Sequence, residues 1–242
     1  MTRKTIYPSL LLMALSLSSC GYDGAKAKAD RDDWHTQMAD SIKSLQKKAS
    51  ADSALLVGAR ETVGRELENF TIVDNPREVE PYYILSSWKG KYPLSGPGLA
   101  ARVMKNEGLE LIAASRSKFS AIRVSAGDDS ATSETVEPDQ ALNYTAGGLT
   151  TVAFTGQKAD SIAMIVARHR TEPLKVEFLN PAPVASITLS NDAADMIAAT
   201  FTLCDAQKQC HLLEKAISID RRKIEILNLT LQKEQEKNHT KK

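Results

Sequence analysis

The chain lacks an excess of charge of either sign. Its 242 residues include 31 Lys and Arg against 30 Asp and Glu, so the formal net charge is +1. A nucleic-acid-binding protein needs a basic footprint, and nucleic acid is therefore not an expected partner. Long apolar runs are also lacking, because a membrane-spanning helix needs roughly 20 consecutive apolar residues and no segment reaches that length.

Sequence motifs of common enzymes are missing too. There is no P-loop, no Rossmann glycine pattern, no HExxH and no GxSxG. The four histidines are His35, His169, His211 and His239, and three of them fall in expected helices or the tail. The sequence therefore predicts a protein that is not an enzyme and that has no cofactor or metal.

Cysteine is scarce, at positions 20, 204 and 210. Cys204 and Cys210 fall in an expected helix, where six residues correspond to a rise of about 9 Å, more than the Cα separation that a disulfide tolerates. A c-type haem motif needs two residues between its cysteines, and no zinc ligand set accompanies the pair. A buried thiol at Cys210 is the favoured interpretation, and an intermolecular disulfide through Cys204 is the alternative.

The N-terminus carries the most specific motif. Arg3 and Lys4 precede an apolar run from Ile6 to Leu17, which has the form of a cleavable secretory signal. The run ends in Leu17-Ser18-Ser19-Cys20, which resembles the lipobox of bacterial lipoproteins.

This resemblance implies that residues 1–19 are a signal peptide and that Cys20 is the lipidation site. More than one acyl chain, palmitate among them, would anchor the mature protein, because one chain alone anchors weakly. Residues 20–32 are small and polar and are expected to be a flexible tether. They contain no dense acidic run directly after Cys20, which favours a protein that faces the periplasm over one exported to the cell surface. The outer membrane is the expected location, rather than the inner membrane.

Two long helices are predicted, over residues 33–70 and 191–236, followed by a hydrophilic tail at 237–242. In both, side chains recur at spacings of three and four that place them on one stripe. The first stripe is Met38, Ile42, Leu45, Ala49, Asp52, Leu56, Ala59 and Val63. The second is Met196, Ala199, Leu203, Ala206, Cys210, Leu213, Ile217, Asp220, Ile224, Leu227 and Leu231.

The middle, residues 76–189, is predicted to be a β-rich head of short strands with one helix at 158–168. The expected strands are 82–86, 101–105, 109–114, 120–125, 141–145, 150–155, 174–179 and 185–189. Ala146-Gly147-Gly148 has the chemistry of a hairpin turn, and residues 128–138 form an expected acidic, mobile loop. The predicted class is α+β: two long antiparallel helices, pairing as a coiled-coil-like stalk, flank a small sandwich or barrel.

Polar residues on the two stripes need an explanation. Asp52 and Asp220 would be costly to bury without a partner. They are interpreted as devices that fix register or admit water, and a catalytic carboxylate pair is the less favoured alternative.

Tyr82, Trp88 and Tyr92 lie in the densest aromatic stretch. Such rings, Trp88 and Tyr92 among them, can bind sugars or protein partners from an exposed loop. The favoured interpretation is that Tyr83, Leu85 and Trp88 fill the core instead. Arg168-His169-Arg170 can bind an anion, although cations at a helix C-terminus are expected from the helix dipole alone.

The sequence thus predicts a membrane-anchored envelope lipoprotein with a structural or protein-interaction role. Its stalk helices would pair with an envelope protein or with further copies of the chain, because an antiparallel helix pair leaves part of each stripe uncovered. The alternative is a ligand- or glycan-binding lipoprotein that uses Tyr82, Trp88 and Tyr92.

Overall fold

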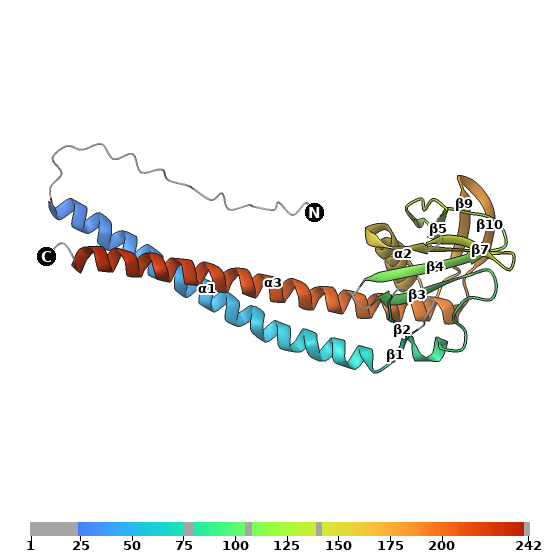
Figure 1. Ribbon diagram of the computed structural model, residues 1–242, viewed down its shortest axis with the longest axis horizontal. Coiled ribbons are helices and arrows are strands. Elements are labelled where there is room, and N and C mark those ends of the chain that lie inside the picture. Colours follow the sequence, from blue (N-terminus) through green and yellow to red (C-terminus); the bar gives the residue numbers. More distant parts are fainter. Residues whose placement is uncertain (1–23, 75–79, 105–107, 139–141, 240–242) are drawn as a thin grey trace. The chain divides into compact units, whose positions relative to one another are not determined.

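The computed structural model describes residues 24–74, 80–104, 108–138 and 142–239. These residues form three α-helices and two antiparallel β-sheets, so the predicted α+β class is confirmed (Figure 1). Neither sheet closes into a barrel within the described residues. The chain divides into two compact units, one of residues 1–45 with 223–242 and the other of residues 46–222, and each is described by itself.

The two long helices are α1, Gly24–Leu67, and α3, Asn191–His239. The tether predicted at 20–32 is therefore helical from Gly24 on, and residues 20–23 lie outside the described part. α3 also includes the first residues of the predicted tail, up to His239. Its start is capped as expected, since the Ser190 hydroxyl accepts a hydrogen bond of 3.2 Å from the N–H of Ala193.

The heptad stripes predicted for α1 and α3 are the covered faces of these helices, because every one of their residues is buried or half-buried. In the unit of residues 46–222, Lys48 on α1 contacts Asp220 on α3, and Arg60 contacts Glu214. Residue numbers rise along one helix as they fall along the other, so these segments run antiparallel. In the unit that holds the remaining ends of both helices, Ile42 is buried.

Ten strands make up the two sheets. The six-stranded sheet has the order β1-β2-β3-β4-β8-β7, and the four-stranded sheet the order β10-β9-β5-β6. Their bounds are β1 Phe70–Val73, β2 Tyr82–Leu85, β3 Gly98–Met104, β4 Leu109–Ser115, β5 Ala121–Ala126, β6 Asp129–Thr132, β7 Asn143–Ala146, β8 Leu149–Phe154, β9 Lys175–Asn180 and β10 Ala182–Thr188.

Eight of these strands lie close to the predicted ones, and two were not predicted. β1 pairs with β2 from Phe70 to Val73, in a segment assigned to the end of the first helix and the link after it. β6 occupies part of the stretch 128–138 that was predicted to be a mobile loop, and it pairs with β5. Between β7 and β8, Gly147 and Gly148 have φ of 59° and 76°, so the predicted glycine turn is confirmed.

One contiguous apolar core fills the unit of residues 46–222. The helix α2, Gly156–Arg168, buries Ile162 and Val166 in it. The first turns of α3 enter the same core, where the Met196 sulfur lies 3.2 Å from the N–H nitrogen of Ala101 on β3. A 3-10 turn, η1 at Ser86–Trp88, completes the described elements. None of the described helices is both long and apolar enough to cross a lipid bilayer.

Candidate functional site

The predicted aromatic residues lie mostly inside the protein. The side chains of Tyr82 and Trp88 are 2% and 6% exposed, and Tyr92 is half-buried. An exposed platform for a ligand would need these rings at the surface. Of the residues expected to fill the core, Trp88 is buried, but Tyr83 and Leu85 are only half-buried against it, and Tyr82 is buried in place of Tyr83. The predicted lipidation site Cys20 lies outside the described residues.

A buried arginine, Arg102, packs its guanidinium over the faces of two of these rings. The Arg102 guanidinium carbon lies 4.5 Å from the centre of the Tyr82 ring and 6.0 Å from that of Tyr92. Arg102 Nη1 donates to the Tyr92 hydroxyl at 3.1 Å. Cation–π contacts of this kind stabilise a desolvated cation, so the two rings stabilise the buried charge of Arg102.

Glu110 balances the charge of Arg102. The two residues are directly opposite on β3 and β4, and Arg102 Nε donates to the Glu110 carboxylate. Both side chains are buried, so their ion pair is a structural contact that sequence reasoning missed. The available signal was the presence of two charged residues of opposite sign in otherwise apolar strands.

Asp220, on the stripe of α3, is buried and paired with a lysine of α1. The Lys48 ammonium lies 2.5 Å from Asp220 Oδ2 and 3.5 Å from Asp52 Oδ2. The hydrogen bond to Asp220 raises the pKa of Lys48 above its ordinary value. A shared cation between two stripe carboxylates fits the register interpretation, because it fixes which turns of the helices face each other.

The burial of the two cysteines of α3 is the reverse of what the sequence predicts. Cys204 is the buried one, at 1% exposure, whereas Cys210 is half-buried. The idea of an intermolecular disulfide through Cys204 was wrong, because its sulfur is covered by the core. Cys210 and His211 border a small cavity of about 210 Å³ between α1 and α3, and the described residues contain no group of three or more His, Cys, Asp or Glu suited to a metal ion.

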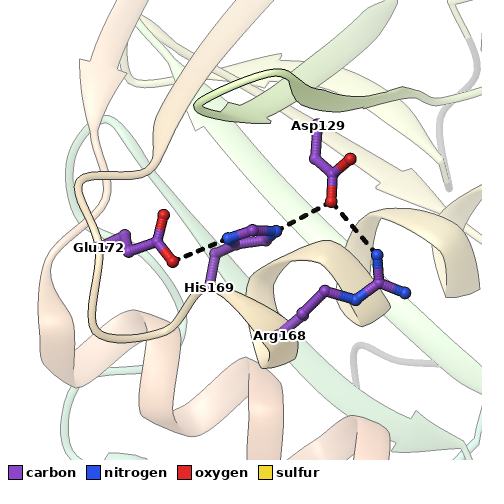
Figure 2. Close-up of polar contacts among 4 residues, drawn as sticks. All are labelled: Asp129, Arg168, His169 and Glu172. Atoms are coloured by element: carbon purple, nitrogen blue, oxygen red, sulfur yellow. Dashed lines mark hydrogen bonds and ion pairs between the residues drawn. The ribbon is translucent and has the colours of Figure 1, made fainter.

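His169, at the C-terminus of α2, is held between two carboxylates (Figure 2). Its Nε2 lies 3.0 Å from Asp129 Oδ2, and its Nδ1 lies 3.0 Å from Glu172 Oε1. Arg168 Nη1 donates to the same Asp129 oxygen at 3.2 Å. The stretch Arg168-His169-Arg170 therefore uses its first two residues for contacts with acidic side chains, and these contacts tie the start of β6 to the end of α2.

The electrostatics of this cluster favour a protonated imidazole. Carboxylates only accept hydrogen bonds when ionised, so they are both satisfied only when each ring nitrogen carries a hydrogen. Accordingly, the hydrogen bonds to Asp129 and then to Glu172 raise the pKa of His169. The pKa of Asp129 is lowered, first by His169 and then by Arg168. A histidine with both nitrogens engaged has no nitrogen left to accept a proton from a nucleophile, which is the usual catalytic role.

A cavity of about 730 Å³ lies elsewhere in the same unit. Its wall is formed by the start of β5, the stretch after β6, the hairpin β7–β8 and the turn between β9 and β10. Both sheets therefore contribute to it. Sequence reasoning missed it because its residues come from segments that are distant in the chain and share no motif.

The loop that forms one side of this cavity is held in place by the buried Asn143. Asn143 Nδ2 donates to the carbonyl of Val136 at 2.7 Å. The N–H of Val136 in turn donates to the carbonyl of Ser120 at 2.8 Å. Although the stretch 133–138 has no regular secondary structure, its backbone is fixed against β5 in a defined conformation, and the cavity is preformed.

We compared the chain with protein-family models, with curated proteins and with solved structures, and none of the three comparisons found a match.

Proposed function

We propose that the chain is a lipid-anchored protein of the bacterial cell envelope, with a non-enzymatic role in binding another protein. In this proposal α1 and α3 pair along their lengths as an antiparallel stalk, and the stalk carries the β-rich unit. The ion pairs Lys48–Asp220 and Arg60–Glu214 support the pairing. The partner is an envelope protein or a further copy of the chain.

The observation that carries the proposal is a set of large apolar side chains on the outer surfaces of the paired helices. Leu55 and Val57 on α1 are 61% and 58% exposed, and Leu212 and Ile219 on α3 are 58% and 45% exposed. Leu212 and Ile219 are one heptad apart and so lie on the same side of α3. They do not belong to the stripe that pairs α3 with α1, so they are available for a further helix.

The arrangement of His169 supports a role without chemistry. Both of its ring nitrogens are engaged by carboxylates. The buried pair Arg102–Glu110 is enclosed by tyrosines. These charged groups are used for contacts within the fold.

The interaction is tested by placing charge on the outer surface of α3. We expect that a chain with Leu212→Lys and Ile219→Lys keeps its unfolding temperature but no longer recovers its partner from gently crosslinked envelopes. Ser218→Lys is the control for an added lysine, because Ser218 is an exposed residue of the same helix; it adds one positive charge, and the double variant adds two. If the double variant recovers the same partner in the same amount as the unaltered chain, the outer surface of α3 is not the interface.

The anchor is tested independently. We expect the unaltered chain to incorporate labelled palmitate and to fractionate with outer membranes, and Cys20→Ser to do neither. Incorporation of label by Cys20→Ser would overturn the lipidation site, and release of the unaltered chain in soluble form would overturn the anchoring.

The alternative function, a glycan-binding lipoprotein that uses Tyr82, Trp88 and Tyr92, has less support. Two of these rings are buried, and the cavity of about 200 Å³ that Trp88 borders is below the usual range for a ligand, ~300–1,000 Å³.

A further inference from the structure

We infer that the cavity of about 730 Å³ beside β5 and β7 is a binding site for a neutral carbohydrate of one or two sugar rings. This goes beyond the proposed function, which uses the outer surfaces of α1 and α3. It also concerns different residues from the aromatic stretch that the sequence singled out. Three features of the cavity carry the inference: its size and rigidity, the chemistry of its wall, and one exposed aromatic ring.

The size and rigidity of the cavity suit a small ligand. Sites for small molecules usually enclose ~300–1,000 Å³, and this cavity falls in the upper part of that range. Its wall is fixed before a ligand arrives, since the N–H of Ser133 donates to the carbonyl of Ile122 at 2.9 Å and Asn143 holds the backbone at Val136. A preformed wall reduces the entropy that must be lost on binding.

The wall is rich in groups that both donate and accept hydrogen bonds. Hydroxyl groups come from serine, threonine and tyrosine residues and an amide comes from Asn180. Hydroxyl and amide groups match the hydroxyls of a sugar, which also donate and accept. The hydroxyls of Ser133, Thr145 and Thr150 already make hydrogen bonds within the protein, so the other hydroxyl and amide groups of the wall are the ones offered to a ligand.

The charges on the wall do not favour an anion. The wall contains two basic residues, Lys118 and Arg123, and one acidic residue, Glu137. Arg123 also lies 3.5 Å from the carboxylate of Glu177 on β9, so its charge is largely balanced within the protein. A site for a phosphate or another strong anion would combine several cations that converge on one point, and this wall does not.

Tyr144 is the exposed aromatic residue of the wall. It lies on β7, borders the cavity, and is 44% exposed. The hairpin that β7 forms with β8 also contributes Thr145 and Thr150 to the wall, and their hydroxyls are joined by a hydrogen bond of 2.9 Å. An aromatic ring combined with a polar tip is suited to the C–H face and the hydroxyl edge of a sugar.

Calorimetric titration of the full lipid-bearing chain in detergent tests the inference. The probes are glucose, galactose, mannose, N-acetylglucosamine and their disaccharides at millimolar concentration. We expect saturable binding of at least one probe, at least a tenfold loss of affinity in Tyr144→Ala and in Asn180→Ala, and a change below threefold in Tyr144→Phe, which keeps the ring.

Each substitution is at or near the surface of the cavity, so the variants should fold, and an unchanged unfolding temperature shows that they do. Trp88→Phe is the control for the aromatic stretch and should bind the probe as the unaltered chain does. The inference is overturned if no probe binds saturably, or if a probe binds with the same affinity to Tyr144→Ala and Asn180→Ala. Neither result bears on the helix surface tested under the proposed function.

Discussion

The residue that does most to define the pairing of the long helices is Asp220. A buried carboxylate is costly unless it is paired, and Asp220 is 3% exposed with Lys48 at 2.5 Å. A slip of one turn between the helices would move Lys48 away and leave the carboxylate without this cation. The main effect of the pair is therefore to make other alignments of α1 against α3 unfavourable, because they would leave a buried carboxylate without its cation.

We predict that Lys48→Met lowers the free energy of unfolding by about 1–2 kcal/mol. The value is below the about 3–5 kcal/mol typical of breaking a buried pair, because Lys48 itself is mostly exposed and its charge is screened by water. Lys47→Met is the matched control, since Lys47 is an exposed neighbour on the same helix. Urea unfolding of both variants at pH 7 is the measurement. Equal stability of the two would contradict the role assigned to the pair.

We predict a pH-dependent contribution from His169. Its pKa is raised by the hydrogen bonds to Asp129 and Glu172, so its stabilising effect is fully present below the ordinary pKa of 6.5 and is lost as the pH rises through the raised value. His169→Gln should therefore be less stable than the unaltered chain at pH 5.5, and the difference should shrink towards pH 9. Asp129 adds no opposing trend in this window, because its pKa is lowered and its contribution falls away only at acid pH.

Urea unfolding between pH 5.5 and 9 measures the effect, with His211→Gln as the control because His211 is an exposed residue on α3. A difference between His169→Gln and the unaltered chain that stays constant over this range, or grows with pH, would show that the imidazolium is not the stabilising form.

For single residues, the sequence predicted which side chains are unusual better than it predicted which side chains they contact. Asp220 and Asp52 were identifiable because each interrupts an apolar stripe, and the stripe can be recognised from the residue spacing within a single helix. Lys48 did not stand out, since surface lysines are common and only the tertiary pairing brings it to Asp220. Asp129 was assigned to a mobile loop for the same reason: its contact with His169 joins residues 40 positions apart in the chain.

Among the elements, the helices were the most predictable because their information is local. The three-four spacing of stripe residues requires no knowledge of the partner, and every stripe residue is buried or half-buried in the structure. The strands β1 and β6 were missed because each has four residues and depends on pairing with a neighbour. The sequence of β6, Asp-Ser-Ala-Thr, has no apolar alternation, and its strand conformation comes from its hydrogen bonds to β5.

We predict that two glycines weaken α1 without serving its packing. A methyl group added at Gly58 or Gly64 would meet no atom within 4 Å, and alanine favours a helix over glycine by about 1 kcal/mol. Gly58→Ala and Gly64→Ala should each stabilise the protein by about that amount in urea unfolding.

Gly148→Ala should have the opposite effect and serves as the comparison. Gly148 has a φ of 76°, a left-handed conformation that costs an L residue with a side chain about 1–2 kcal/mol. If alanine at Gly58 and Gly64 is also destabilising, these positions make a close contact that the described packing does not contain.

For the whole molecule, the two units depend on α3 in different ways. The unit of residues 46–222 has its own apolar core. The other unit consists, in its described part, of two helical ends, Gly24–Leu45 of α1 and the segment of α3 from Lys223 on. Among the described residues of this second unit, the end of α3 is the segment that can cover the stripe residues of α1.

We predict that truncation after Arg222 causes self-association. The truncation removes Ile224, Leu227 and Leu231, and it leaves Met38, Ile42 and Leu45 of α1 without cover. Light scattering at equal concentrations should show aggregates. A chain truncated after Lys237 keeps the α3 stripe and should remain dispersed, as the control. A monodisperse chain after truncation at Arg222 would mean that the two helical ends do not cover each other.

The interaction proposed for the helices is the central claim of this account, and photo-crosslinking in living cells tests it most directly. A photoreactive residue is placed at Leu212 on the outer surface of α3 in the full chain, and at Ser218 as the control. The account predicts a discrete crosslinked product from position 212, with one envelope protein or with a second copy of the chain, and loss of this product when Ile219→Lys is added. A folded, membrane-anchored chain that gives no discrete product at position 212, or one that Ile219→Lys leaves unchanged, would contradict it.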